Sequence, residues 1–426
     1  MSGKTFRLWG GLFLVCSLIF LSHYFFAGEA IYGDGIDYWA NLHTWYIDKN
    51  LDYTNEFRHL YSPENNSSKN DVLAPVPLKT RITDTGRTDN PHPPGTAILW
   101  LPAYVIGDLM ARLWGVPNGY SNLYQLTVGL ATIAYVTAGL WVMYVFCRRL
   151  TGDKRISLLS ALGILVASPL LYYGTYDVIN SHALSFFVTA YFWYKWWFFN
   201  THEKWGWDKL MLLAALAINI RLGDITLAIP LLWIILRYPA GALKRVFRGL
   251  ITMMLVSWPM VWQWVMLYGK PWPETYLAFG HKYNGILGVM FHPTNGLVRT
   301  PILILALGGL SMIKKFPRLR IMTIVLLINL MLVIMQGGWQ DAAYGARMFT
   351  ANFPLLILSL GLLLKSFRIR FGLKSAAVVV GVLAIINIVS ITSFVLLEKQ
   401  VNSGQRRGLE EHAIQKWRQI INGEWD

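Results

Sequence analysis

Long apolar runs separated by short basic segments constrain the fold of this chain more than any other feature. Of its 426 residues, 54% are hydrophobic and only 14% are charged, whereas a soluble domain carries roughly 25% charged residues. Apolar runs of about 17–25 residues are long enough to cross a bilayer as helices. The sequence therefore predicts an all-α polytopic membrane protein that forms a single domain over residues 1–426. We interpret the first run, residues 8–27, as an uncleaved first span.

Basic residues predict the orientation of these spans, because cytoplasmic loops of membrane proteins are enriched in Lys and Arg. If every basic cluster faces the cytoplasm, the runs between clusters must cross in pairs, which gives eleven spans with the N-terminus inside and the C-terminus outside. The net charge of +15 does not indicate a nucleic-acid partner, since the basic residues lie in short clusters between spans. The clusters are Lys4/Arg7, Arg148/Arg149/Lys154/Arg155, Lys204/Lys209, Arg237/Lys244/Arg245/Arg248, Lys314/Lys315/Arg318/Arg320 and Lys365/Arg368/Arg370/Lys374. The predicted spans are 8–27, 122–147, 157–173, 180–199, 209–221, 225–237, 247–268, 300–313, 321–336, 350–365 and 375–396.

Two stretches decide this count. Residues 95–114 read as a span, but counting them would place the later basic clusters outside, so we expect a helix that lies in the outer interface or re-enters it. Residues 209–237 are basic at both ends, so two short spans fit better than one tilted span.

The resulting first outer loop, residues 28–120, is acidic, and a second outer segment forms the tail at 397–426. The loop holds eleven of the 23 acidic residues in the chain. Its segment 36–48 predicts an amphipathic helix on the membrane surface, with Asp37 and Asn41 on one face and Tyr38, Leu42 and Trp45 on the other.

The loop also carries the strongest candidates for chemistry. Asp34 stands before the predicted helix, where it could cap the helix or act as a general base for a hydroxyl group if burial raises its pKa. Asp37 is the second candidate carboxylate and Glu56 the third. His92 could contact substrate, but a His in the Pro-rich stretch "NPHPP" is as often structural.

Arginines at outer span ends form a further group, because they oppose the positive-inside bias and a phosphate partner would account for them. The alternative is an ion pair with a loop acid, such as Arg221 with Asp224 or Arg347 with Asp341. Residues assigned to substrate binding are Tyr38, Glu56, His92, His182, Arg221, Arg299 and Arg347.

Three segments then occur in a recognisable order: "DGIDY" (34–38), "NPHPPGTAILW" (90–100) and "GGWQDAAYGARMFTANFPLLILSL" (337–360). This order resembles the GT-C superfamily of integral-membrane glycosyltransferases, which includes the protein O-mannosyltransferases and the lipid A aminoarabinose transferase. The first segment resembles the family's Asp-Glu-x-x-Tyr turn, whose Asp is the proposed base, and the second resembles its Lys-Pro-Pro-Leu-x-x-Trp stretch. Gly35 and His92 depart from the family's Glu and Lys.

The resemblance implies transfer of a sugar from a polyprenyl-phosphate donor to a hydroxyl of a lipid, glycan or protein on the extracytoplasmic face. Asp34 would accept the proton in an inverting displacement, and Arg347, with Arg299 or Arg221, would stabilise the leaving phosphate. A divalent metal could share that task with Asp37, although no spacing defines a metal site. The expected location is the inner membrane of a bacterium, with the site on its periplasmic or extracellular side. The alternatives are a transporter or flippase for a lipid-linked saccharide, a polysaccharide polymerase or ligase, and a non-catalytic assembly subunit.

Overall fold

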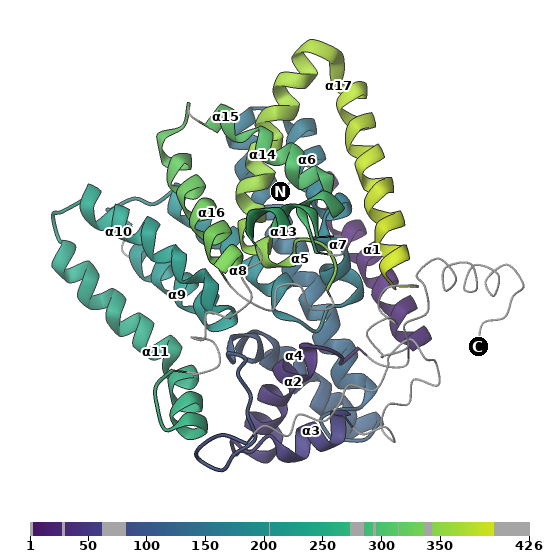
Figure 1. Cartoon of the computed structure of the whole chain (residues 1–426), viewed down its shortest axis with the longest axis vertical. Coiled ribbons are helices and arrows are strands. Elements are labelled where there is room, and N and C mark those ends of the chain that lie inside the picture. The colour runs from purple at the N-terminus through teal and green to yellow at the C-terminus, as the bar shows by residue number, and fades with distance from the viewer. Residues whose placement is uncertain are drawn as a thin grey trace, which may run out of the picture.

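The computed structural model describes residues 3–27, 30–61, 82–203, 205–272, 285–292, 295–313, 315–335 and 343–395. These ranges are helical (Figure 1), and their only extended pairing is an isolated antiparallel bridge between Ile82 and Thr88. The predicted all-α class is therefore confirmed. The predicted outer tail 397–426 and the proposed partner Asp341 lie outside the described residues.

The helices follow the apolar runs closely, and short π-helical or 3₁₀ turns connect several of them. The helices are α1 (Gly3–Ala27), α2 (Gly35–His43), α3 (Thr54–Tyr61), α4 (Gly95–Trp114), α5 (Asn122–Thr151), α6 (Lys154–Ala167), α7 (Pro169–Leu171), α8 (Ser181–Trp197), α9 (Gly206–Ile220), α10 (Ala228–Arg237), α11 (Ala242–Tyr268), α13 (Gly285–Phe291), α14 (Pro301–Gly308), α15 (Leu310–Ile313), α16 (Pro317–Met335) and α17 (Phe353–Ser393). The turns are η1 (Thr44–Asp48), η2 (Tyr172–Tyr176), η3 (Leu222–Leu227), η4 (Leu297–Arg299) and η5 (Arg347–Asn352).

Six helical segments in the described part of the chain are long and apolar enough to cross a membrane: α1, α4, α5, α11, α16 and α17 with η5. A seventh results if α6 and the α7–η2 segment, bent by 73° relative to each other, form one span. The predicted count of eleven spans is not confirmed. Helices α8, α9 and α10 have only 17, 15 and 10 residues, whereas a span needs about 20 residues.

Basic residues gather at one end of the helices. Arg368, beside the bend of α17 at Gly372, forms an ion pair with Asp153 between α5 and α6. Arg318 at the start of α16 donates to the backbone oxygen of Trp197, 2.6 Å away, where α8 ends. Arg149, near the end of α5, lies 5.0 Å from the centroid of the Phe198 ring just after α8. Together these contacts bring the ends of α5 and α8, the start of α16 and the α17 bend to one end of the fold, which we call the basic end.

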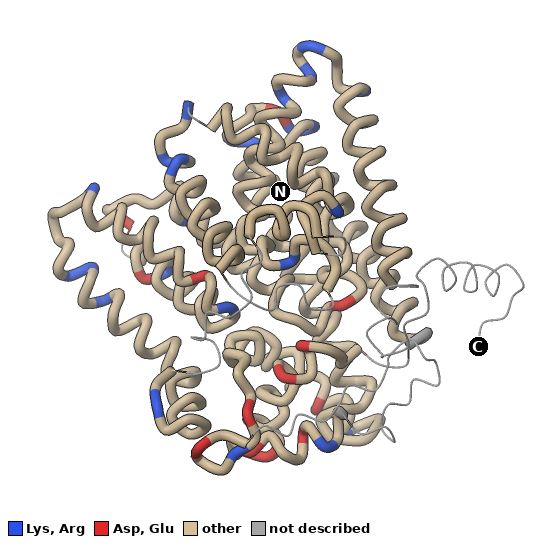
Figure 2. Tube along the Cα trace, in the orientation of Figure 1, with Lys and Arg blue, Asp and Glu red and all other residues tan. Residues whose placement is uncertain are grey.

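The opposite end holds the first loop, and we call it the acidic end. Tyr24, late in α1, donates to Asn122 at the start of α5 over 2.6 Å, and Thr85 donates to the backbone oxygen of Leu267 near the end of α11 over 2.6 Å. Figure 2 shows Asp and Glu concentrated among the lower helices around α2 and α3, with most Lys and Arg at the helix ends above them. The charge asymmetry along the sequence is thus an asymmetry between two ends of the fold.

Helix α4 lies at the acidic end and runs antiparallel to the first half of α5. Tyr124 donates to Asp108 over 2.5 Å and Trp100 donates to Thr132 over 2.8 Å, so the two helices run in opposite directions. The start of α4 meets the end of α9, because a Cβ on Gly95 would lie 2.3 Å from the backbone of Asn219. Helix α4 is long and apolar enough to cross a membrane. Its start, however, lies beside the end of α9 at the acidic end.

Helix α2 forms where the amphipathic helix was predicted, but its environment differs from the prediction. Every residue from Gly35 to His43 is buried, including Trp39 and Leu42 at 0% and 1% exposure. The predicted apolar face on the membrane surface is therefore wrong: Tyr38 and Leu42 of that face are buried inside the protein, and Tyr38 donates to Ser181 at the start of α8. Asp37 and Asn41 share a face as predicted, because both side chains contact His92: Asp37 Oδ2 lies 3.5 Å from its Nδ1, and Asn41 donates to its backbone oxygen over 3.2 Å.

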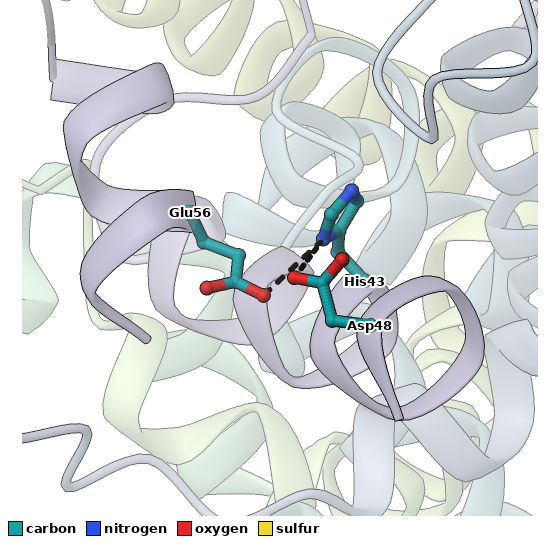
Figure 3. A group of neighbouring side chains, drawn as sticks. All are labelled: His43, Asp48 and Glu56. Carbon is teal, nitrogen blue, oxygen red and sulfur yellow. Dashed lines mark hydrogen bonds and ion pairs between the residues drawn. The ribbon is translucent and has the colours of Figure 1, made fainter. Parts of the chain in front are cut away.

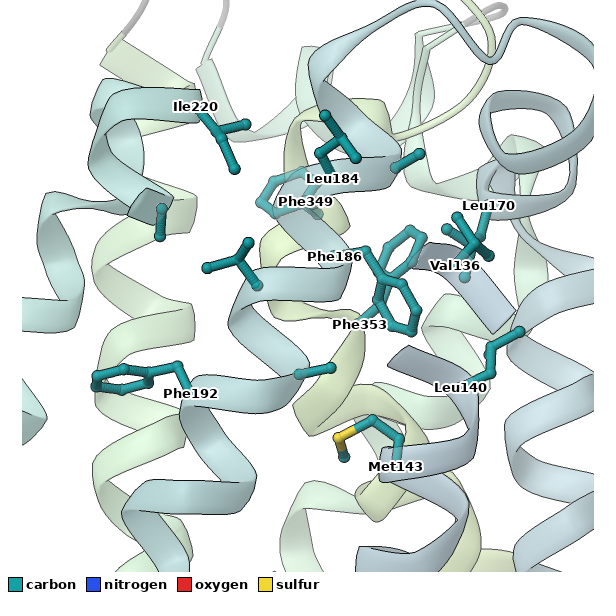
Figure 4. Close-up of a cluster of buried hydrophobic side chains, with 14 of the residues drawn as sticks. Val136, Leu140, Met143, Leu170, Leu184, Phe186, Phe192, Ile220, Phe349 and Phe353 are labelled. Atoms are coloured by element: carbon teal, nitrogen blue, oxygen red, sulfur yellow. The ribbon is translucent and has the colours of Figure 1, made fainter. Parts of the chain in front are cut away.

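An apolar cluster between α5, α8 and α17 supports the acidic end (Figure 4). Leu140, Phe186 and Phe353 are all fully buried in it. Within a bilayer, helix association rests on close packing rather than on the hydrophobic effect, so small residues at helix contacts matter. Gly139 is such a residue, since a Cβ there would lie 2.9 Å from the Phe186 ring. This packing holds the start of α8 and η5 side by side, which positions the polar residues described next.

Candidate functional site

Asp34 stands at the beginning of α2, where the chain passes very close to another segment. It occupies the N-cap position of α2, but its side chain makes no capping hydrogen bond. The next residue, Gly35, packs against the backbone of Ile179, because a Cβ there would lie 2.4 Å from the Ile179 carbonyl oxygen. Backbone contact at this distance leaves no room for a side chain, which gives a physical reason for glycine at this position.

The Asp34 carboxylate faces Arg347, and the two residues are 313 positions apart in the sequence. Arg347 Nη1 lies 3.3 Å from Asp34 Oδ2, with the Arg347 side chain 15% exposed and the Asp34 side chain 47% exposed. The burial expected for a general base is therefore not found at Asp34. The Nε of Arg347 is buried and has no hydrogen-bond partner among the described residues.

Asp37 and His92 form a second acid–base contact one helical turn further along. Asp37 is 1% exposed, and its Oδ2 lies 3.5 Å from Nδ1 of His92. The His92 ring meets the Tyr38 ring edge to face, with centroids 4.6 Å apart. Asn41 fixes the His92 backbone by donating to its carbonyl oxygen over 3.2 Å. Three side chains of α2 therefore hold His92 in place. This position gives His92 a structural role and leaves it beside Asp37 and Tyr38, where it could also contact a substrate.

His182 connects the start of α8 to two arginines. Nη1 of Arg221, which caps the end of α9, donates to Nδ1 of His182. A hydrogen bond also joins His182 to the backbone of Arg347. The other Arg221 contact is between Nη2 and the sulfur of Met348, at 3.1 Å. A thioether is a weak acceptor, so Arg221 has donors left for another group.

The alternative pairing of Arg221 with Asp224 is found only as a longer-range interaction. Asp224 accepts a hydrogen bond from Ser185 over 2.9 Å. Burial raises the pKa of Asp224 to about 7, and the nearby Arg221 charge and the Ser185 hydrogen bond only partly offset this rise.

Two residues assigned to substrate binding lie elsewhere. Glu56 is fully buried at the far end of α2, where it bonds to His43, so the structure does not bring it to Asp34. Arg299 donates to Ser390 of α17 through Nε over 2.5 Å and through Nη2 over 3.2 Å. The guanidinium of Arg299 lies 5.8 Å from the ring centroid of Tyr344, so these contacts of Arg299 are with α17 and Tyr344.

Two further residues belong to the site but were not singled out in the sequence. Ser181 accepts a hydrogen bond from Tyr38 over 2.8 Å, which attaches α2 to the start of α8. The Tyr173 ring lies 4.8 Å from that of His182, and its hydroxyl accepts from the backbone nitrogen of Tyr344 over 3.0 Å. Their only sequence signal was the polar and aromatic outer segment "YGTYDVINSH" at 173–182.

Only one group of the described residues has the geometry to hold a metal ion: His43, Asp48 and Glu56 (Figure 3). Asp37 is not part of it, so the structure does not support a metal shared with Asp37.

We call the polar side chains around Asp34 the Asp34 group: Asp34, His92, His182, Arg221 and Arg347. This group combines a solvent-accessible carboxylate, two guanidinium groups and two imidazoles at the acidic end. Guanidinium groups present planar arrays of donors that match phosphate. The carboxylate offers a proton acceptor beside them. Such an arrangement can bind a phosphoryl group and accept a proton from a hydroxyl nearby.

Comparisons with known protein families, with curated proteins and with solved structures find no match to this chain.

Proposed function

We propose that the protein is a glycosyltransferase of the GT-C type, which moves a sugar from a polyprenyl-phosphate donor to an acceptor hydroxyl. The observation that carries this proposal is the pairing of Asp34 with Arg347 at 3.3 Å. Asp34 and Arg347 come from two of the sequence segments that resemble the family, 34–38 and 337–360. These segments lie far apart in the chain, and nothing in the sequence spacing requires the two residues to meet.

In the proposed reaction, Arg347 and Arg221 bind the donor phosphate. The phosphate competes with Asp34 for the Arg347 guanidinium and thereby releases the carboxylate from its ion pair. A carboxylate that loses a positive partner becomes a better proton acceptor, so Asp34 then takes the proton of the acceptor hydroxyl as its oxygen attacks the anomeric carbon. The arginines stabilise the charge that grows on the leaving phosphate, which lowers the barrier rather than only strengthening binding.

The same proposal places the site on the extracytoplasmic side of a bacterial inner membrane. The basic end would face the cytoplasm, as the enrichment of Lys and Arg in cytoplasmic loops predicts. The proposal keeps the eleven membrane spans, with α8, α9 and α10 as short spans that neighbouring helices shield from lipid. Helix α4 would stay at the outer boundary, because its start meets the end of α9 at the acidic end.

Substitution of Asp34 by Asn separates binding from chemistry. We expect transfer to fall by about 10²–10⁴-fold, the range for loss of a general base, while the thermal stabilisation by added polyprenyl phosphate persists. Arg347→Gln should lose that stabilisation, and Arg347→Lys should recover part of it because the charge remains without the planar donors. Asp84→Asn, at an exposed acid of the same end, is the matched control. Normal transfer by Asp34→Asn, in proteoliposomes supplied with a panel of polyprenyl-phosphate sugars, would refute the assignment of the base.

Sidedness can be measured with cysteine labelling in whole cells. Both native cysteines, Cys16 and Cys147, are buried, so an introduced surface cysteine should dominate the labelling. Asp84→Cys at the acidic end should react with a membrane-impermeant maleimide, whereas Gly152→Cys at the basic end should react only after lysis. The reverse pattern would overturn the orientation and with it the extracytoplasmic site.

A further inference from the structure

A compact group of three side chains lies at the far end of α2 from Asp34. His43 ends α2, Asp48 ends η1, and Glu56 belongs to α3. Nδ1 of His43 lies 3.2 Å from Glu56 Oε1 and 3.5 Å from Asp48 Oδ2. The three potential ligand atoms all lie within 4.8 Å of one another, and Figure 3 shows the two carboxylates pointing toward the same imidazole nitrogen.

The backbone between His43 and Asp48 creates this arrangement. Residues five apart lie on different faces of an α-helix, which has 3.6 residues per turn, but they align in a π-helical turn. The turn η1 supplies that geometry over Thr44–Asp48, and Lys49 then leaves it with a left-handed φ of 56°. Thr44 donates to the backbone oxygen of Asn50 over 3.0 Å, which holds the exit of the turn. Single π-helical turns are frequent at functional sites.

The second ring nitrogen of His43 determines what its first can do. Nε2 lies 3.3 Å from the backbone oxygen of Asn118, and because a carbonyl oxygen only accepts, Nε2 carries a proton. Nδ1 of a neutral ring then presents a lone pair to two carboxylate oxygens, which is repulsive unless a cation lies between them. A histidine that donates one N–H to a backbone carbonyl while its other nitrogen faces carboxylates has the orientation of a metal ligand.

Charge and burial strengthen the requirement for a cation. Glu56 is fully buried, and its Oε2 has no hydrogen-bond partner. Asp48 gains one hydrogen bond from Asn55, over 2.6 Å, but no Lys or Arg among the described residues forms an ion pair with either acid. A proton on His43 would balance only one of the two carboxylates. Asp48 is 21% exposed, but the fully buried Glu56 carboxylate is costly unless it is paired or bound to a metal.

We propose that His43, Asp48 and Glu56 bind one divalent transition-metal ion, with Zn²⁺ as the best fit. An imidazole with two carboxylates suits zinc better than calcium or magnesium, which prefer oxygen ligands only. Three protein ligands leave a fourth position for water. The ion fastens the end of α2 to α3, and its ligand His43 also contacts the 116–121 segment. It thereby fixes the helix whose other end carries Asp34, about 13 Å away along nine residues. The metal site does not depend on the proposed sugar transfer.

The test uses the full-length protein in detergent, purified without a polyhistidine tag and dialysed against a chelator. After addition of Zn²⁺ and removal of excess, we expect one zinc per chain by elemental analysis and a rise in Tm that saturates with zinc concentration. Ca²⁺ and Mg²⁺ at the same concentrations should not raise Tm. Co²⁺ in place of zinc should give a d–d absorption spectrum typical of nitrogen and oxygen ligands. These measurements on the unaltered chain remain decisive even if a variant does not fold.

Two substitutions test the ligands and a third is their control. His43→Gln and Glu56→Gln should each weaken zinc binding by at least about 10-fold and abolish the zinc-dependent rise in Tm. His59→Gln is the matched control, because the His59 ring also stacks on Tyr120, at 4.0 Å, as the His43 ring does at 4.2 Å, but His59 is not in the group. A chain that retains no zinc, or a Glu56→Gln variant that binds zinc as tightly as the unaltered protein, would show that the group is an imidazolium–carboxylate network without a metal.

Discussion

A single methyl group added at Gly35 tests the packing that holds Asp34 in place. The Cβ would lie 2.4 Å from the carbonyl oxygen of Ile179, whereas ordinary Cβ contacts begin at 3.4 Å. Relief therefore needs a displacement of at least 3.4 − 2.4 = 1.0 Å between α2 and segment 177–180. Since the obstructing atom belongs to the backbone, no side-chain rotation can relieve the clash.

The expected magnitude follows from this displacement. Overpacking a well-packed contact costs about 1–3 kcal/mol. A shift of 1.0 Å along the Asp34–Arg347 contact would lengthen it from 3.3 to 4.3 Å, beyond ion-pair range. Because Asp34 is half exposed, solvent screens the pair, and its loss adds at most about 1 kcal/mol. We therefore expect Gly35→Ala to reduce the free energy of unfolding by about 1–4 kcal/mol.

Intrinsic fluorescence reports the unfolding, since the chain contains 19 Trp residues. A double-mutant cycle between Asp34→Asn and Arg347→Gln should give a small coupling energy in the unaltered background and none in the Gly35→Ala background. Gly223→Ala is the control, because nothing lies within 4 Å of a Cβ there. If Gly35→Ala and Gly223→Ala have the same Tm, or if the coupling energy survives in Gly35→Ala, the reasoning about this close approach is refuted.

Two other substitutions probe the acidic end. Gly119 has a φ of +78°, and a Cβ there would lie 2.5 Å from both the His43 ring and the Tyr104 hydroxyl, so Gly119→Ala should lose about 2–5 kcal/mol of stability; an unchanged Tm would contradict the observed packing. Asp224 has its pKa raised from 3.8 to about 7 by burial, so the folded protein binds this proton more tightly than the unfolded chain does. The stability it contributes is fully present below pH 3.8 and is lost as the pH rises through about 7. Asp224→Asn does not titrate, so its free energy of unfolding relative to that of the unaltered protein should rise up to about pH 7 and then level off, with a total rise of no more than about 4 kcal/mol. A difference in Tm between the two proteins that stays constant between about pH 4.5 and 8 would contradict the raised pKa.

Several features of the site were predictable because they depend on residue type. Asp34 and Arg347 were selected since an acid in a Gly-flanked turn and an arginine at an outer helix end are both unusual beside apolar runs. The shared face of Asp37 and Asn41 followed from helical periodicity, and both side chains contact His92 in the structure. The close packing of Gly35 on Ile179 then explains why residue 35 is a glycine, which the sequence alone does not explain.

Other features were beyond sequence patterns. The apolar face of α2 was assigned to the membrane because an amphipathic pattern does not distinguish lipid from an apolar protein surface, and Leu42 of that face is in fact buried by its neighbours. Glu56 was grouped with Asp34 by proximity in the sequence, although the length of α2 separates them. The meeting of His43 with Asp48 depends on a π-helical turn, for which five-residue spacing alone gives no signal.

Composition and charge order alone predicted a helical chain with apolar spans and with one basic and one acidic end, because the cost of exposing polar backbone to lipid and the bias of basic residues act on every membrane protein. The partners of individual side chains were decided only by the tertiary structure. Arg347 pairs with Asp34, whereas Arg299, which was also expected to bind phosphate, contacts Ser390. Which partner each arginine has depends on which helix faces touch, and that depends on close packing at contacts such as Gly35 against Ile179. Steric fit of this kind acts over a few ångströms between residues hundreds of positions apart, so it exists only once the helices have assembled.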